Sequence, residues 1–220
     1  MSVGAQRPRS RSPAAGRPVT RPELVVPHHA LPVSLPLRVA PDELVAEWLR
    51  LEPALLPHAA MLTGLVLTAT AEPEPGEVAA FLMYEEVGGC LVGGTALLSL
   101  ELVEPMLGPP SIRADLITAR LREAARSLGH VEGLTQLGRR RTASGVPSTR
   151  VRFLTTLFPA WDVGDVGCSP MVEVCRWLYP VPTHRDLAWS LAFHTPDLDH
   201  AEMLVAGFDA MASSLRWAGS

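Results

Sequence analysis

Four residues that can bind metal ions lie close together near the C-terminal end of the sequence. They are His194, Asp197, Asp199 and His200. Imidazole nitrogens and carboxylate oxygens can bind zinc or a harder metal ion. However, the spacing of zinc sites is absent, and Asp199 stands where a helix needs an acceptor for its first amides. We therefore expect a strand-to-helix junction here, with no metal site and no cofactor.

A cysteine, a histidine and an aspartate could form a nucleophilic site. Cys168 falls in one expected loop, and His184 and Asp186 fall in another. A thiolate paired with an imidazole can attack a carbonyl carbon, as in a small hydrolase-like enzyme. No motif of a known nucleophile surrounds these residues. The enzyme is therefore the alternative hypothesis, and we expect a protein without catalytic residues.

Five arginines occur within fourteen positions of the middle of the chain. They are Arg139, Arg140, Arg141, Arg150 and Arg152. If the intervening loop is a hairpin, they could meet at one sheet edge and bind an anion or an acidic partner through paired hydrogen bonds. The alternative is a solvated, charged edge that discourages aggregation.

Two tryptophans and a tyrosine could form an apolar interface, if they are partly exposed. They are Trp161, Trp177 and Tyr179. Burial in the core is the usual position for large aromatic residues in strands. We keep Trp161 and Trp177, together with the five arginines, as candidate binding residues.

Charge is distributed unevenly along the 220 residues. All 19 basic residues are arginines, and residues 1–22 contain five of them and no acidic residue. The remaining 14 arginines face 23 acidic residues, a net charge of −9. A body this acidic is a poor nucleic-acid binder, so we expect no specific nucleic acid as partner. Residues 1–22, which have few large apolar side chains, are predicted to be a disordered tail, and residues 23–220 a single domain.

The cysteines and the apolar segments indicate the cellular compartment of the protein. The three cysteines, Cys90, Cys168 and Cys175, are odd in number and form no C-x-x-C motif, which is typical of reduced thiols. Prolines interrupt the N-terminal segment, so a signal peptide is not expected. No apolar stretch has the length and composition of a membrane span. We expect a cytoplasmic protein.

The C-terminal fifth gives the clearest structural pattern. Residues 171–179 and 187–194 are predicted to be strands joined by a Pro-containing turn, and 187–194 alternates like a half-buried strand. A helix should follow, with Asp199 as cap, Glu202 reaching back to it, and Leu198 and Met203 as a hydrophobic staple. Its apolar stripe is Leu204, Phe208, Met211 and Leu215.

The rest of the chain predicts hairpins and two further helices. We expect an irregular or edge strand over 23–40, a helix from Pro41 to Pro53 and a strand over 61–70, although residues 53–62 could hold a further short helix. A hairpin should follow over 78–103, with a bulge or bend at Gly93 and Gly94. A second helix is expected over 111–128, then a basic turn at 139–141, a strand over 149–158 and a loop over 159–170. Three helices and six or seven strands joined mostly as hairpins indicate an α+β fold with a largely antiparallel sheet.

Several short motifs accompany this order of elements. They are Gly145-Val-Pro-Ser-Thr-Arg150, Trp177-Leu-Tyr-Pro-Val-Pro182, Leu191-Ala-Phe-His-Thr-Pro196 and Phe208-Asp-Ala-Met-Ala-Ser-Ser-Leu-Arg-Trp217. Over residues 30–217 the pattern resembles the PsbP-like α/β sandwich family, in particular uncharacterised actinobacterial members. The resemblance implies a PsbP-like fold and a non-enzymatic binding or assembly module.

The sequence thus predicts a non-catalytic module that binds a protein partner, or itself, through a sheet face or the Arg-rich edge. Two alternatives remain open. One is the enzyme built on Cys168, His184 and Asp186, and the other is a carrier that holds a small apolar ligand between sheet and helices.

Overall fold

The computed structural model describes residues 19–70, 76–102, 131–156, 172–182, 184 and 187–219. The predicted helix over 111–128 and the loop over 159–170 lie outside these residues. The described elements, in chain order, are β1 (Pro22–Glu23), β2 (Ala30–Ser34), α1 (Pro41–Leu51), the 3₁₀ helix η1 (Pro53–His58), α2 (Ala59–Thr70), β3 (Glu77–Val87), β4 (Cys90–Leu102), β5 (Val131–Arg141), β6 (Pro147–Thr156), β7 (Val172–Pro180), β8 (Leu187–Thr195), α4 (Ala201–Ser213) and β9 (Arg216–Trp217).

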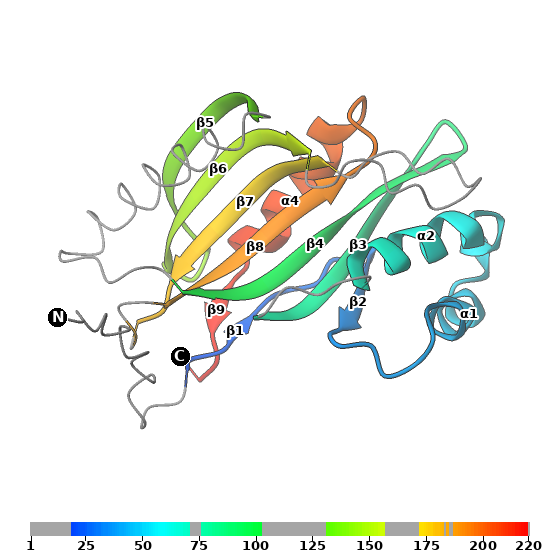
Figure 1. Ribbon diagram of the computed structural model, residues 1–220, viewed down its shortest axis with the longest axis horizontal. Helices are drawn as coiled ribbons and strands as arrows, with labels where there is room; N and C mark the ends of the chain where they lie inside the picture. The colour runs from blue at the N-terminus through cyan, green and yellow to red at the C-terminus, as the bar shows by residue number, and fades with distance from the viewer. Residues whose placement is uncertain are drawn as a thin grey trace, which may run out of the picture.

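Seven of these strands form one antiparallel sheet in the order β2-β3-β4-β8-β7-β6-β5 (Figure 1). The hairpins β3–β4, β7–β8 and β5–β6 supply most of the pairing, and β4 joins β8 at the centre. Strands β1 and β9 form a separate two-stranded pair. The α+β class with a largely antiparallel sheet is therefore confirmed.

Helices cover both faces of the sheet. Successive residues of β3 point to opposite faces, so Phe81 and Met83 join a core with α4, whereas Leu82 and Tyr84 join a core with α1 and α2. We call these the α4 core and the α1–α2 core. The α4 core spans β3, β4, β7 and β8, and the α1–α2 core lies over β2, β3 and β4.

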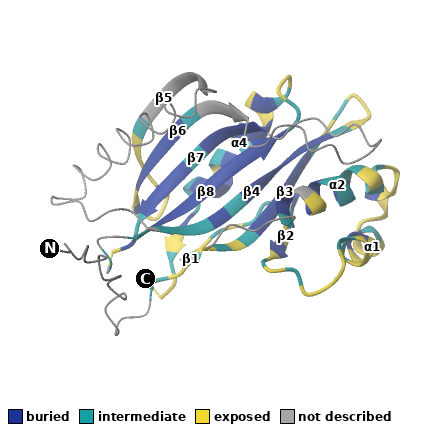
Figure 2. Cartoon of the chain, in the orientation of Figure 1, coloured by how far each residue is buried: buried dark blue, intermediate teal, exposed yellow. Residues whose placement is uncertain are grey.

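Strand β8 is buried on both faces (Figure 2). Trp189, Leu191 and Phe193 belong to the α4 core, as the alternation predicts. The opposite residues, which include Ser190 and His194, are also buried, at 0% and 4% exposure. The prediction of a half-buried strand was wrong, because the small and polar side chains on the second face of this central strand are also buried.

The segment predicted to be a strand over 61–70 is instead the helix α2. Its buried residues Leu62, Leu65, Val66 and Ala69 recur at helical spacing and pack in the α1–α2 core. The hydroxyl of Thr70 donates to the carbonyl of Val66 at 2.7 Å, which satisfies it within the helix. The short uncharged run fits both structures, and tertiary packing outweighs the β propensity of its Thr and Val residues.

The β3–β4 hairpin turns at Gly88 and Gly89, whose φ angles of 59° and 81° suit a two-residue turn. The predicted bulge at Gly93 and Gly94 is absent, since both pair in register with β3. A Cβ on Gly94 would lie 2.7 Å from the Phe193 ring. Glycine is needed there because β8 and its aromatic ring approach closely.

Helix α4 begins one residue later than predicted, and its start differs in detail. The N-cap is His200, which makes no side-chain cap bond, and the amide of His200 donates to Asp197 at 3.3 Å. Leu198 and Met203 are 48% and 39% exposed, so the predicted staple is not buried. The predicted apolar stripe is confirmed, and Leu204, Phe208, Met211 and Leu215 are all buried.

Replacing Phe208 by alanine should lower the free energy of unfolding by about 3–5 kcal/mol. The ring is fully buried and stacks on Phe193 with centroids 5.2 Å apart, so truncation leaves a cavity between helix and sheet. Urea denaturation measures the change. Met203→Ala, on the same helix but partly exposed, is the control and should change stability by about 0.5 kcal/mol or less.

Candidate functional site

The predicted basic turn is part of a strand. Arg139, Arg140 and Arg141 are the last residues of β5, and the turn follows them, closed by a bond from the Thr142 amide to the Val146 carbonyl at 3.0 Å. Strand β5 ends the order of the described sheet. All three arginines are exposed. The prediction of a turn at these residues is wrong, because side chains on an edge strand also reach solvent and can carry successive charges.

The other two candidate arginines, Arg150 and Arg152 of β6, face α4. Arg150 forms a two-pronged ion pair with Asp209, and Arg152 forms another with Glu202, with N–O distances from 2.5 to 2.8 Å. Val151 between them is fully buried on the opposite face. The β5–β6 hairpin therefore brings the five arginines into one region of the fold. Two of them, Arg150 and Arg152, form ion pairs with α4.

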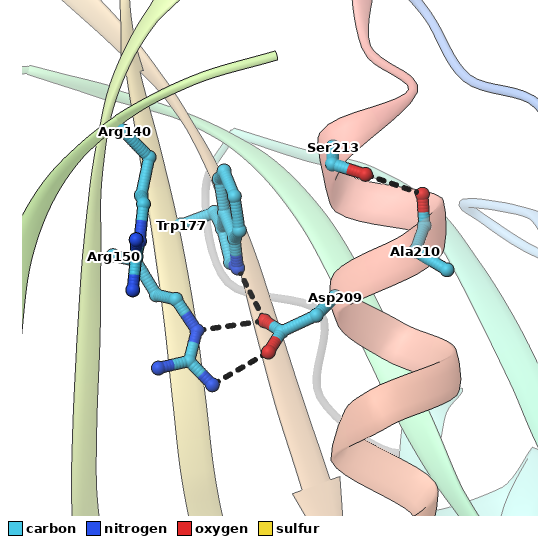
Figure 3. Close-up of a pocket in the computed structure, with 6 residues that line it drawn as sticks. All are labelled: Arg140, Arg150, Trp177, Asp209, Ala210 and Ser213. Carbon is cyan, nitrogen blue, oxygen red and sulfur yellow. Dashed lines mark hydrogen bonds and ion pairs between the residues drawn. The ribbon is translucent and has the colours of Figure 1, made fainter. Parts of the chain in front are cut away.

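Asp209 is the centre of the contact between sheet and helix (Figure 3). One carboxylate oxygen accepts from Arg150 Nε at 2.8 Å and from Trp177 Nε1 at 2.7 Å, and the other accepts from Arg150 at 2.5 Å. Trp177 is 4% exposed, so the partial exposure on which an interface role depends is not met, and its role as a binding residue stays a prediction. Its indole instead supplies a hydrogen bond inside the fold. Trp161 lies outside the described residues.

The charges around Asp209 are matched. Burial lowers the pKa of Arg150, but the hydrogen bonds and charge of Asp209 outweigh burial and raise it. The thiol of Cys175 lies 3.8 Å from Asp209, and burial followed by this negative charge raises its pKa far above neutrality. The thiol is therefore protonated at neutral pH and is not a nucleophile.

The C-terminal end of α4 is also tied to the sheet. Tyr179 of β7 donates its hydroxyl to the carbonyl of Ala212 at 2.8 Å, and the Ala143 amide from the β5–β6 turn donates to the carbonyl of Ser213 at 2.8 Å. Within the helix, the hydroxyl of Ser213 donates to Ala210 at 2.9 Å. These donors satisfy carbonyls that a helix end leaves without partners.

A hollow of about 470 Å³ opens beside this contact. It is lined by Arg140, Arg150, Trp177, Asp209, Ala210 and Ser213, which come from β5, β6, β7 and α4 (Figure 3). The lining combines charged groups with apolar surface, unlike the wholly apolar void that a carrier of an apolar ligand needs.

A second charged cluster lies on the opposite face of the sheet. Arg176 of β7 donates to Glu173 at 2.7 and 3.0 Å and to Glu101 of β4 at 2.8 Å. His194 Nε2 lies 3.6 Å from Glu173. Glu173 is 2% exposed, and although burial raises its pKa, Arg176 and His194 outweigh burial and lower it to about 2.

The other predicted site residues are not brought together as ligands. His194 lies in this cluster, whereas His200 Nδ1 contacts Asp197 at 2.9 Å after β8. Among the residues that the structure describes, no group of three or more His, Cys, Asp and Glu side chains could hold a metal ion. Cys168 and Asp186 lie outside the described residues, so the nucleophilic site stays an untested alternative.

No motif of a known site marks Asp209, Arg176 or Glu173 in the sequence. Asp209 looks like an ordinary polar residue beside an apolar stripe, and its partner Arg150 is 59 positions away. A signal was present in β7, where Glu173 and Arg176 interrupt an otherwise apolar strand. A charge in such a strand requires a buried partner.

Comparison of the chain with protein-family models, curated proteins and solved structures gives no match. The resemblance to the PsbP-like family therefore stays a prediction. In the described part of the chain, no helix combines the length and apolar character needed to cross a membrane.

Replacing Asp209 by asparagine should lower the free energy of unfolding by about 2–3 kcal/mol, because Arg150 would lose its two-pronged ion pair at the contact between sheet and helix. The matched control is Glu202→Gln, which removes the other pair. Glu202 is 84% exposed, so this change should cost less than about 1 kcal/mol. Equal losses in urea denaturation would contradict the central position of Asp209.

Replacing Glu173 by glutamine should change the pH dependence of the free energy of unfolding. The carboxyl pKa falls from 4.5 to about 2 on folding, so the ionised group stabilises the fold above about pH 4.5, and that contribution is lost as the pH falls towards 2. The wild type should be more stable than the variant by the largest margin at pH 7, and by a progressively smaller margin below pH 4.5. Urea midpoints at pH 7 and pH 3 test this, and a constant difference would be the contrary result.

Proposed function

We propose that this chain is a non-catalytic, PsbP-like binding module that recognises an acidic segment of a protein partner along strand β5. The observation that carries the proposal is the position of Arg139, Arg140 and Arg141. They are exposed on the last strand of the described sheet, while Arg150 and Arg152 are used inside the fold.

The edge of a sheet can bind an extended chain. Backbone N–H and C=O groups along the outer side of an edge strand can pair with an added strand. Alternation in β5 places Arg140 on the α4 side of the sheet and Arg139 and Arg141 on the other side. An acidic segment would therefore meet positive charge on both of its faces.

The alternatives have less support in the described residues. A hydrolase needs an activated nucleophile, and the described buried thiol, Cys175, has a raised pKa. A carrier needs an apolar void, whereas the described hollow is lined by Arg140, Arg150 and Asp209. The free thiols of Cys90 and Cys175 are compatible with the proposed cytoplasmic location.

Fluorescence anisotropy with labelled peptides tests the proposal. The peptides are about ten residues long, one alternating valine with glutamate and the other alternating valine with glutamine. The glutamate peptide should bind more tightly. The double variant Arg139→Glu, Arg141→Glu should weaken it by about tenfold or more.

The control double variant is Arg38→Glu, Arg50→Glu. Both residues are exposed and lie near α1, at the other end of the sheet. This control changes the net charge by the same amount as the Arg139→Glu, Arg141→Glu variant. A general electrostatic attraction would therefore weaken equally in both variants. Equal weakening, or equal binding of the two peptides, would contradict a site on β5. Sedimentation velocity with both variants tests whether the partner is a second copy of the chain.

A further inference from the structure

The hollow beside Asp209 shares Arg140 with the strand edge and has features of a second binding site. Its walls come from four elements that are held together by hydrogen bonds across the sheet and helix. The inner wall is rigid, because Arg150 and Trp177 are 9% and 4% exposed and both bind Asp209. The hollow has a volume of about 470 Å³ and is largely open to solvent, so a small molecule bound there would stay partly exposed.

The charge of the hollow is unbalanced. Asp209 is engaged by Arg150, so these two charges largely cancel. Arg140 is exposed, lines the hollow, and has no side-chain hydrogen bond or ion pair among the described residues. Figure 3 shows its side chain extending from β5 towards Arg150. The hollow therefore carries about one net positive charge, which lies on Arg140.

Nothing else in the described lining competes for that charge. The carbonyls of Ala210, Ala212 and Ser213 at the end of α4 already accept hydrogen bonds. They therefore attract the Arg140 guanidinium less strongly than carbonyls without a donor would. The indole of Trp177 and the methyl group of Ala210 add apolar surface. A ligand here should thus combine a single negative charge with an apolar body.

We infer that the hollow binds a small monocarboxylate with an apolar body, whose carboxylate pairs with Arg140 while its body lies against Trp177 and Ala210. One net positive charge matches a carboxylate better than a phosphate, which carries a charge of about −1.5 to −2 at neutral pH. The inference does not depend on the proposed function, because a free acid can fill the hollow with or without a protein segment on β5.

Nuclear magnetic resonance of the full chain tests this inference. The probes are benzoate, benzamide as its uncharged analogue, and inorganic phosphate, each titrated at pH 7 and constant ionic strength. The reporter is the indole N–H signal of Trp177, assigned with a Trp177→Phe variant. Benzoate should shift this signal saturably, with a Kd of about 1 mM, and benzamide should not.

Neighbouring arginines supply the matched variants. Arg140→Gln should abolish the saturable shift, Arg140→Lys should retain part of it, and Arg139→Gln should leave it unchanged because that side chain lies on the other face of the sheet. Retained dispersion of the amide spectrum verifies that each variant is folded.

Three results would overturn the inference. They are the absence of a saturable benzoate shift in the wild type, an equal shift in Arg140→Gln, and tighter binding of phosphate or benzamide than of benzoate. The β5 proposal is tested with Arg139 and Arg141 instead, so either hypothesis can fail while the other stands.

Discussion

The pairing of Asp209 with Arg150 is the interaction on which the contact between the sheet and α4 depends. A charged residue between two packed layers must have a partner, because the surrounding apolar groups cannot solvate it. Here the partner comes from β6, and Trp177 of β7 adds a third donor to the same carboxylate. One side chain thus fixes the position of the helix over two strands.

The same physical demand explains why the two faces of the sheet differ. On the α4 side, the charges lie at the margin of an apolar core and join separate layers. On the opposite side, Arg176 joins Glu173 of its own strand to Glu101 of β4, so its charges tie strands to one another. Arg150, Arg152 and Arg176 are therefore occupied within the fold.

Sequence patterns predicted the elements whose periodicity is strong and sustained. The stripe of α4 and the hairpins were predictable, since turn residues and alternation agree there with the final packing. Helix α2 was not predictable, because its short uncharged sequence is compatible with both a helix and a strand. Packing against Leu82 and Tyr84 of β3 selects the helix. The role of Asp209 was also hidden, since it depends on a residue brought near by two intervening strands.

The bond from the Ala143 amide to the carbonyl of Ser213 has a consequence for motion. It joins a hairpin turn to the end of a helix 70 positions further along the chain. A turn amide normally exchanges its hydrogen quickly, but this one can exchange only when the turn separates from α4. The exchange rate at Ala143 therefore reports the opening of the layer between sheet and helix, and any molecule that bridges the two would slow it.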